Sequence, residues 1–192
     1  MRPDHLIATR RRGLLPWVGR GALCTSLMVS APVRAQAPTQ GAAEQLFQNA
    51  RTQIASKNWP RAWELLSAAY KLDPRPEYAV NLGIVELKLK RPRDAAEHLS
   101  LFLREATNAL PEDRQQAEKK LTEAKAQIGT VTLRVEPASA EVRLDGRPVG
   151  MSPLPGPLYV EPGRRTFEAR KDGSPPESQV VEVEAGRSRW WS

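Results

Sequence analysis

Cysteine and histidine are almost absent from this 192-residue chain, which has one cysteine, Cys24, and two histidines, His5 and His98. A single cysteine excludes an intrachain disulfide framework and a thiolate metal site. Cys24 and His5 both lie in the first 37 residues, which we expect to be removed from the mature chain. The mature core must then be held together by packing alone.

The scarcity of histidine also bears on catalysis. A serine–histidine pair in the mature chain would have to use His98, and no Gly-x-Ser-x-Gly sequence is present to expose a serine nucleophile. His98 follows Glu97 in an amphipathic segment, so we expect it on a solvated helix face. The acidic residues are dispersed, and no glycine-rich loop follows a strand to open a helix. We therefore predict no catalytic residues, no metal site and no cofactor, and hence a protein that is not an enzyme.

The net charge of +7 is concentrated at the N-terminus. Residues 1–37 contain a single acidic residue, Asp4, and six arginines: Arg2, Arg10, Arg11, Arg12, Arg20 and Arg34. That segment has a net charge of +5, which leaves +2 for the remainder of the chain. Most of the positive charge lies in this N-terminal targeting segment, so we expect no nucleic-acid partner.

Residues 1–37 have the organisation of a signal peptide. A basic start precedes an apolar stretch over residues 21–33, and Ala35 and Ala37 are the small residues that a signal peptidase recognises. A membrane anchor needs roughly twenty apolar residues, whereas Arg20 and Arg34 bound this stretch. We expect cleavage after Ala37, no integral membrane span thereafter, and a periplasmic, secreted or cell-envelope location. Residues 9–15 resemble a twin-arginine export motif, although a plain basic start is the alternative.

Apolar residues recur at helical spacing between Ala43 and Ile128. Four amphipathic sets are Leu46, Phe47, Ala50 and Ile54; Ala62, Leu66 and Ala69; Ala95, Leu99, Phe102 and Ala106; and Ala117, Leu121, Ala124 and Ile128. A fifth segment, residues 76–89, is apolar at nearly every uncharged position, which predicts burial on more than one face. Because prolines suit the first turn of a helix and interrupt its interior, the breaks at Pro60, Pro76, Pro92 and Pro111 predict five antiparallel helices.

The helical region repeats itself. Ala50 and Gly83 are thirty-three residues apart, as are Ala62 and Ala95, and Leu66 and Leu99. Together with Leu82-Gly83 and Asp73-Pro74, these residues resemble the tetratricopeptide repeat (TPR), in which small residues let paired helices approach closely. The resemblance covers residues 41–128, with residues 111–128 as a capping helix. The sequence departs from the pattern at Gln53, Ala79, Glu86 and Thr107.

The TPR resemblance implies a groove that binds a peptide or a partner protein. The ligand-facing positions of the family correspond to Arg51, Asn81, Ile84 and Lys88. Asn81 would pair with a peptide amide, and Arg51 and Lys88 with a carboxylate. The alternative is that Asn81 is common before Leu-Gly whatever the repeat binds, and that the lysine only faces water.

After Gly129 the apolar spacing changes from helical to alternate residues, as in the segments TVTLRVE, EVRL, TFEAR and VVEVE. Turn residues separate these segments. The pattern predicts a small antiparallel sandwich over residues 129–187, followed by a tail at residues 188–192. The overall fold class is therefore α+β with two domains.

Residues 129–186 resemble the PEGA domain. The resemblance lies in residues 135–142, 144–150, 152–154 and 160–163 and in Gly173, in matching order and spacing. In AEVRLDGRPVG, residues 140–150, it implies a strand, a tight Asp-Gly turn and a second strand. Ser174-Pro175-Pro176 departs from the pattern after Gly173.

The resemblances imply a non-enzymatic adaptor of the cell envelope, with a helical groove for a peptide or protein and a PEGA domain that docks to another envelope component. The alternative is a domain that binds cell-wall polysaccharide or peptidoglycan, with the repeats mediating oligomerisation. Sugar binders expose aromatic side chains, and this half has only Tyr159, Phe167, Trp190 and Trp191. For the tail with its two tryptophans, a membrane or partner surface and an edge strand are both open.

Overall fold

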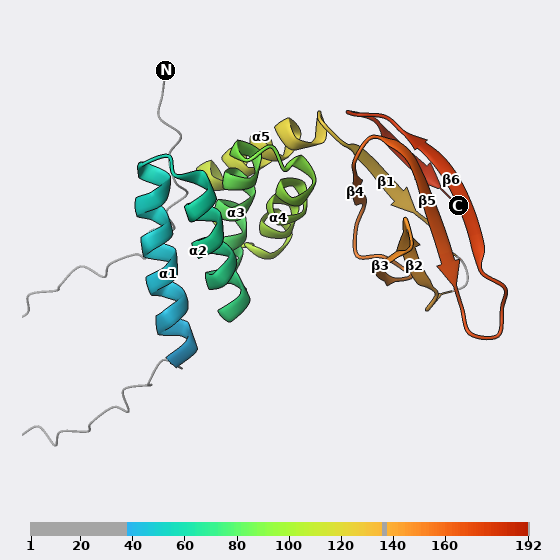
Figure 1. The fold of residues 1–192 in the computed structure, drawn as a ribbon, viewed down its shortest axis with the longest axis horizontal. Coiled ribbons are helices and arrows are strands. Elements are labelled where there is room, and N and C mark those ends of the chain that lie inside the picture. Colours follow the sequence, from blue (N-terminus) through green and yellow to red (C-terminus); the bar gives the residue numbers. More distant parts are fainter. Residues whose placement is uncertain (1–37, 136–137, 192) are drawn as a thin grey trace, which may run out of the picture.

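The computed structural model describes residues 38–135 and 138–191. The segment expected to be a signal peptide, residues 1–37, lies outside the described residues, so its cleavage and its export route stay predictions. The helices occupy one end of the molecule and the strands the other (Figure 1).

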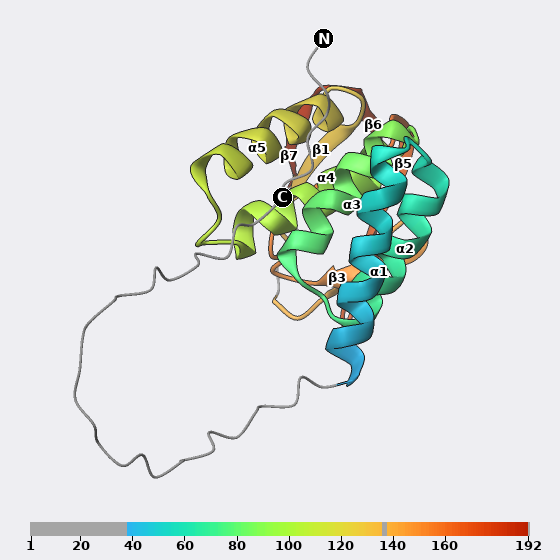
Figure 2. The same ribbon diagram turned by 90° about the vertical axis from the view of Figure 1, so that its left-hand side faces the viewer.

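Five helices pack in chain order, each against the next. They are α1 (Pro38–Ala55), α2 (Trp59–Leu72), α3 (Pro76–Lys88), α4 (Pro92–Glu105) and α5 (Pro111–Lys125). Proline stands in the first turn of each helix from α2 to α5, because a missing N–H costs nothing there. Figure 2 shows the helical stack from the end at which α1 lies. The number of helices and their proline boundaries confirm the sequence prediction.

Helix α3 is the centre of the stack. Every residue from Tyr78 to Leu87 is buried, as predicted for a helix covered on more than one face. A Cβ atom at Gly83 would lie 2.6 Å from Leu99 Cγ and 3.1 Å from the Ala95 carbonyl oxygen, so only glycine allows α3 and α4 to approach this closely. The other positions of the thirty-three-residue repeat, Ala50, Ala62, Leu66, Ala95 and Leu99, are also fully buried.

Within the described residues, seven strands form two small sheets. They are β1 (Gly129–Leu133), β2 (Glu141–Leu144), β3 (Arg147–Met151), β4 (Leu158–Val160), β5 (Gly163–Arg170), β6 (Glu177–Val183) and β7 (Ser188–Trp191). One sheet has the order β3-β2-β5-β6 and the other β4-β1-β7. Asp145 and Gly146, with φ of 50° and 78°, form the predicted Asp-Gly turn between β2 and β3.

Strand β7 corrects the expectation of an entirely antiparallel sandwich. The four-stranded sheet is antiparallel throughout, but β7 pairs parallel with β1, with Thr130 opposite Ser188 and Leu133 opposite Trp191. After β6 the chain crosses from one sheet to the free edge of the other, where no hairpin fixes an antiparallel direction. The predicted tail is thus an edge strand, one of the two alternatives open from the sequence.

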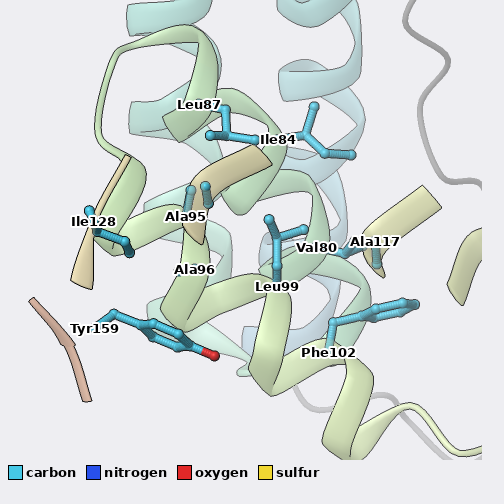
Figure 3. Packing of buried hydrophobic residues seen from close by; sticks show 11 residues of the cluster. Val80, Ile84, Leu87, Ala95, Ala96, Leu99, Phe102, Ala117, Ile128 and Tyr159 are labelled. Atoms are coloured by element: carbon cyan, nitrogen blue, oxygen red, sulfur yellow. The ribbon is translucent and has the colours of Figure 1, made fainter. Parts of the chain in front are cut away.

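The helices and strands meet in a shared apolar cluster. Tyr159 of β4 is 5% exposed and packs with Ile128, Ala96 and Leu99, so its ring belongs to the helical core (Figure 3). The Gly186 N–H donates to the Ile128 carbonyl oxygen at 2.9 Å and holds the β6–β7 turn on the end of the helical half. These contacts join the two halves at a packed seam.

Across residues 38–135 and 138–191, no helix combines the length and apolar character needed to cross a membrane.

Candidate binding surfaces

A polar strip runs along α1. Gln48 donates to Glu44 at 2.7 Å, and Arg51 donates to Gln48 at 3.4 Å. The three residues share one helix face because they are three and four positions apart. Arg51 was predicted to lie in a groove, whereas Glu44 and Gln48 were missed; their helical spacing from Arg51 is the signal that could have found them.

Glu44 connects this strip to α3. The Tyr78 hydroxyl donates to Glu44 Oε2 at 3.2 Å, and Arg75 lies 3.9 Å from the same carboxylate. Burial, together with the Glu44 carboxylate, raises the pKa of Tyr78 to about 12 against the opposing influence of Arg75. Tyr78 is therefore a neutral donor that fixes α1 against α3.

Asn81 occupies the middle of α3 and is 1% exposed. Its Nδ2 donates to the Glu77 carbonyl oxygen at 2.8 Å, within its own helix. Its Oδ1 has no hydrogen-bond partner. Leaving a buried acceptor unsatisfied costs about 1–3 kcal/mol, so this oxygen is an unpaired acceptor inside the stack.

Ile84 and Lys88 follow Asn81 on α3, at spacings that place all three on neighbouring parts of one helix face. Ile84 is 7% exposed and packs with Val80 and Leu87 in the cluster shared with α4 and α5, so its main contacts are internal. Lys88 is half-buried at the end of the helix, with its Nζ 5.8 Å from the centroid of the Trp59 ring. The roles of all four predicted groove residues in binding stay predictions.

His98 corrects the expectation of a solvated face. Its Nδ1 lies 2.8 Å from Glu86 Oε2, and the Trp63 Nε1–H donates to Glu86 Oε1 at 3.2 Å. The Glu86 side chain is 3% exposed and that of His98 25% exposed. The Tyr70 ring meets the His98 ring edge-on at 5.6 Å. Helices α2, α3 and α4 therefore share a buried polar cluster of Trp63, Glu86 and His98.

Two opposing effects act on the pKa of His98. Burial lowers it, but the hydrogen bond to Glu86 and the negative charges of Glu86, Glu97 and Asp94 together outweigh burial, so the pKa is raised above its ordinary value. The charged imidazolium is thus the form that this cluster favours.

The sheet half has a cleft of about 660 Å³ between its two sheets. Apolar side chains from both sides line it, among them Leu133, Val142, Phe167 and Val181, and the polar residues Arg134, Glu168 and Glu177 are also part of the lining. The lining residues place the cleft beside the end of β1, across from β5 and β6. Figure 1 shows the β5–β6 ladder extending past that end of β1. It is a pocket with an apolar floor and charged groups around it.

Exposed apolar side chains lie on two of the edge strands, β6 and β7. Val180 of β6 is 49% exposed, and Trp190 of β7 is 82% exposed. Beside Trp190, Arg187 and Arg189 both form ion pairs with Glu184, at 3.7 and 3.3 Å. Both strands end their sheets, so the described structure leaves one side of each without a neighbouring strand.

Within the residues described, no group of three or more histidine, cysteine, aspartate or glutamate side chains is placed to hold a metal ion.

No protein-family model matches the sequence, and no curated protein matches it either.

Proposed function

We propose that this protein is a non-enzymatic adaptor of the cell envelope, exported by means of residues 1–37 and cleaved near Ala37. Its helical half binds a peptide or protein partner, and its sheet half docks to another envelope component. The proposal takes residues 41–128 to be TPRs and residues 129–187 to be a PEGA domain, the families that their sequences resemble. The order of a helical stack followed by small sheets is compatible with both.

The unsatisfied Oδ1 of Asn81 is the observation on which the helical part of the proposal rests. Because Asn81 is 1% exposed, a partner backbone N–H reaches this oxygen only if α3 shifts against its neighbours. The partner then gains a hydrogen bond without breaking an existing one, since Nδ2 is already bonded within α3. Arg51, in the strip on α1, and Lys88, at the end of α3, supply positive charge for a carboxylate. A backbone donor and a carboxylate are the features of an extended peptide.

The alternative, a polysaccharide or peptidoglycan binder, is supported by one observation, the 82% exposure of Trp190. Tyr159 and Phe167 are 5% and 6% exposed, so neither offers a free ring for stacking on a sugar. Among the aromatic side chains that the structure describes in this half, Trp190 alone is exposed, which makes a weak carbohydrate platform, and the adaptor remains the better-supported function.

Photo-crosslinking in the envelope tests the helical surface directly. A photoreactive residue in place of Arg51 is expected to capture a specific partner, whereas one in place of Arg61, which is exposed on α2, is expected not to. Equal capture from both positions would remove the groove from the proposal. Fractionation of the same cells, with the full-length chain found unprocessed in the cytosol, would contradict the exported location.

Asn81→Ala supplies a second test with the captured partner. We expect affinity to fall about tenfold, the equivalent of one hydrogen bond. The free energy of unfolding should change by less than about 1 kcal/mol, because a local bond and an unsatisfied oxygen are lost together. Asn49→Ala, at an exposed position of α1, is the matched control and should alter neither quantity. Unchanged affinity in Asn81→Ala would show that Oδ1 is not a recognition group.

A further inference from the structure

Strand β6 has an unusual combination of long pairing and little burial. It pairs with β5 along its whole length, from Glu177 opposite Ala169 to Val183 opposite Gly163. Only Val181 and Val183 are buried, and the four residues from Glu177 to Val180 are exposed. As the last strand in the order β3-β2-β5-β6, it presents a row of backbone donors and acceptors on its outer side.

The charges on β6 are all of one sign. Glu177 and Glu182 are its only charged residues, and neither forms an ion pair within the described structure. Arg164 stands opposite Glu182 on β5, yet no ion pair joins them. Charged side chains on an edge strand discourage pairing with an edge of the same charge, and this edge carries two carboxylates without an ion pair, one on each side of the exposed Val180.

The cleft lies on the inner side of this edge. Glu177, Ser178, Gln179 and Val181 of β6 line the cleft, so the alternate side chains on the inner face of a strand added beside β6 would lie at its open side. Phe167 and Val142 form part of its apolar floor. The edge and the cleft together suit an extended segment with apolar residues at its centre.

We propose that β6 accepts an additional strand from a basic partner segment. Two lysine or arginine residues, five positions apart, would lie beside Glu177 and Glu182, and two adjacent apolar residues would lie beside Val180 and Val181. Backbone hydrogen bonds supply affinity in such strand addition, and the side-chain pattern supplies specificity. The inference deepens the proposed docking of the sheet half and therefore rests on that function, but it concerns a different surface from Asn81.

The choice of a basic partner over a second copy of this chain follows from the charges. Pairing of two β6 strands would bring together two edges that each carry only negative charge. A basic strand instead supplies a positive charge for each of the two free carboxylates.

Fluorescence anisotropy with the purified full chain and a labelled peptide, TKVVTTKT, tests the proposal. An antiparallel TKVVTTKT strand would place its lysines beside Glu177 and Glu182. We expect it to bind about tenfold more tightly than TEVVTTET, because opposite charges stabilise cross-strand pairs and like charges destabilise them. Equal affinity for the two peptides, or no binding of either, would overturn the proposal.

A charge exchange makes the test specific to the edge. The double variant E177K/E182K should reverse the preference and bind TEVVTTET more tightly. The control E112K/E118K changes the net charge equally on the exposed surface of α5 and should leave the preference unchanged. Reversal in the control as well would mean that overall charge, not β6, selects the peptide. Circular dichroism checks that each variant is folded, and E182K alone should show half of the change in free energy.

Sedimentation of the full chain tests whether a second copy of the chain, instead of a basic partner, occupies the edge of β6. A monomer over the concentration range of the peptide assay supports the proposal, whereas a dimer that E177K/E182K alters would assign the edge to a second copy. The peptides bind β6 and do not involve α1 or α3. A negative peptide assay therefore does not affect the Arg51 and Asn81 experiments, and negative results in those experiments do not affect the peptide assay.

Discussion

The helical half and the sheet half bury their side chains to different extents. Ten consecutive residues of α3, from Tyr78 to Leu87, are buried, whereas in β6 only Val181 and Val183 are. The helical half also buries a polar cluster around Glu86, while the sheet half leaves an open cleft of about 660 Å³. The comparison indicates that packing in the stack supplies rigidity, and that the incomplete cover of the longer sheet leaves surface for recognition.

Removal of a phenylalanine from each half should give the largest difference. Phe102 is fully buried, so Phe102→Ala should cost about 3–5 kcal/mol through lost burial and an unfilled cavity. Phe167 already borders the cleft, so Phe167→Ala should cost less, about 2–3 kcal/mol. Urea unfolding followed by circular dichroism measures both. Equal losses would break the contrast between a closed core and an open one.

Substitutions of two glycines test how closely the helices of the stack pack. Gly83→Leu should cost about 3 kcal/mol, because its side chain would collide with Leu99 and the Ala95 carbonyl group. Gly41→Leu makes the same change at a helical position with no atom within 4 Å of the added Cβ, so it should be neutral or stabilise by about 0.5–1 kcal/mol. The midpoint and slope of urea unfolding distinguish the two. A near-neutral Gly83→Leu would invalidate the alignment of the two helical pairs.

The buried polar cluster predicts a pH dependence that belongs to the helical half alone. Since the pKa of His98 is raised in the folded state, its contribution to stability is fully present below the unfolded pKa of about 6.5 and is lost as pH rises through the folded value. Stability measured between pH about 5 and about 8 should therefore decline with pH, in part through His98. His98→Gln should flatten that part of the profile. An unchanged profile in His98→Gln would exclude His98 as its source.

The smallest effect is expected at the edge of the sheet half. Trp190 is 82% exposed, so Trp190→Ala should change the free energy of unfolding by less than about 0.5 kcal/mol. The Trp190→Ala variant should also bind TKVVTTKT with unchanged affinity, because the proposed peptide site is the edge of β6. Pelleting with purified peptidoglycan that depends on Trp190 would favour the polysaccharide alternative.

The sequence was most informative where the structure depends on local signals. Prolines and helical spacing located all five helices, and Asp145-Gly146 located the turn between β2 and β3. These features depend on the backbone preferences of neighbouring residues, which a sequence displays directly.

The remaining features depend on relations between distant segments. The pairing of His98 with Glu86 requires α3 and α4 to be aligned, and the parallel direction of β7 depends on how the chain crosses between sheets. The cleft brings Leu133 and the two residues after it together with residues of β2, β5 and β6, so it too depends on how distant segments are placed. For the candidate groove, the sequence predicts Arg51, Asn81, Ile84 and Lys88, a binding role that stays a prediction, but the residue types alone did not indicate that Asn81 would be 1% exposed.

Tyr159 has a consequence for the order in which the protein matures. The ring that completes the core around Ile128 belongs to β4, thirty-one positions further along the chain. A ribosome that has released all five helices has therefore not yet supplied the residue that closes them. A nascent chain halted shortly after Ile128 should display an apolar opening on α4 and α5, and folding of its N-terminal half is completed only by its C-terminal half.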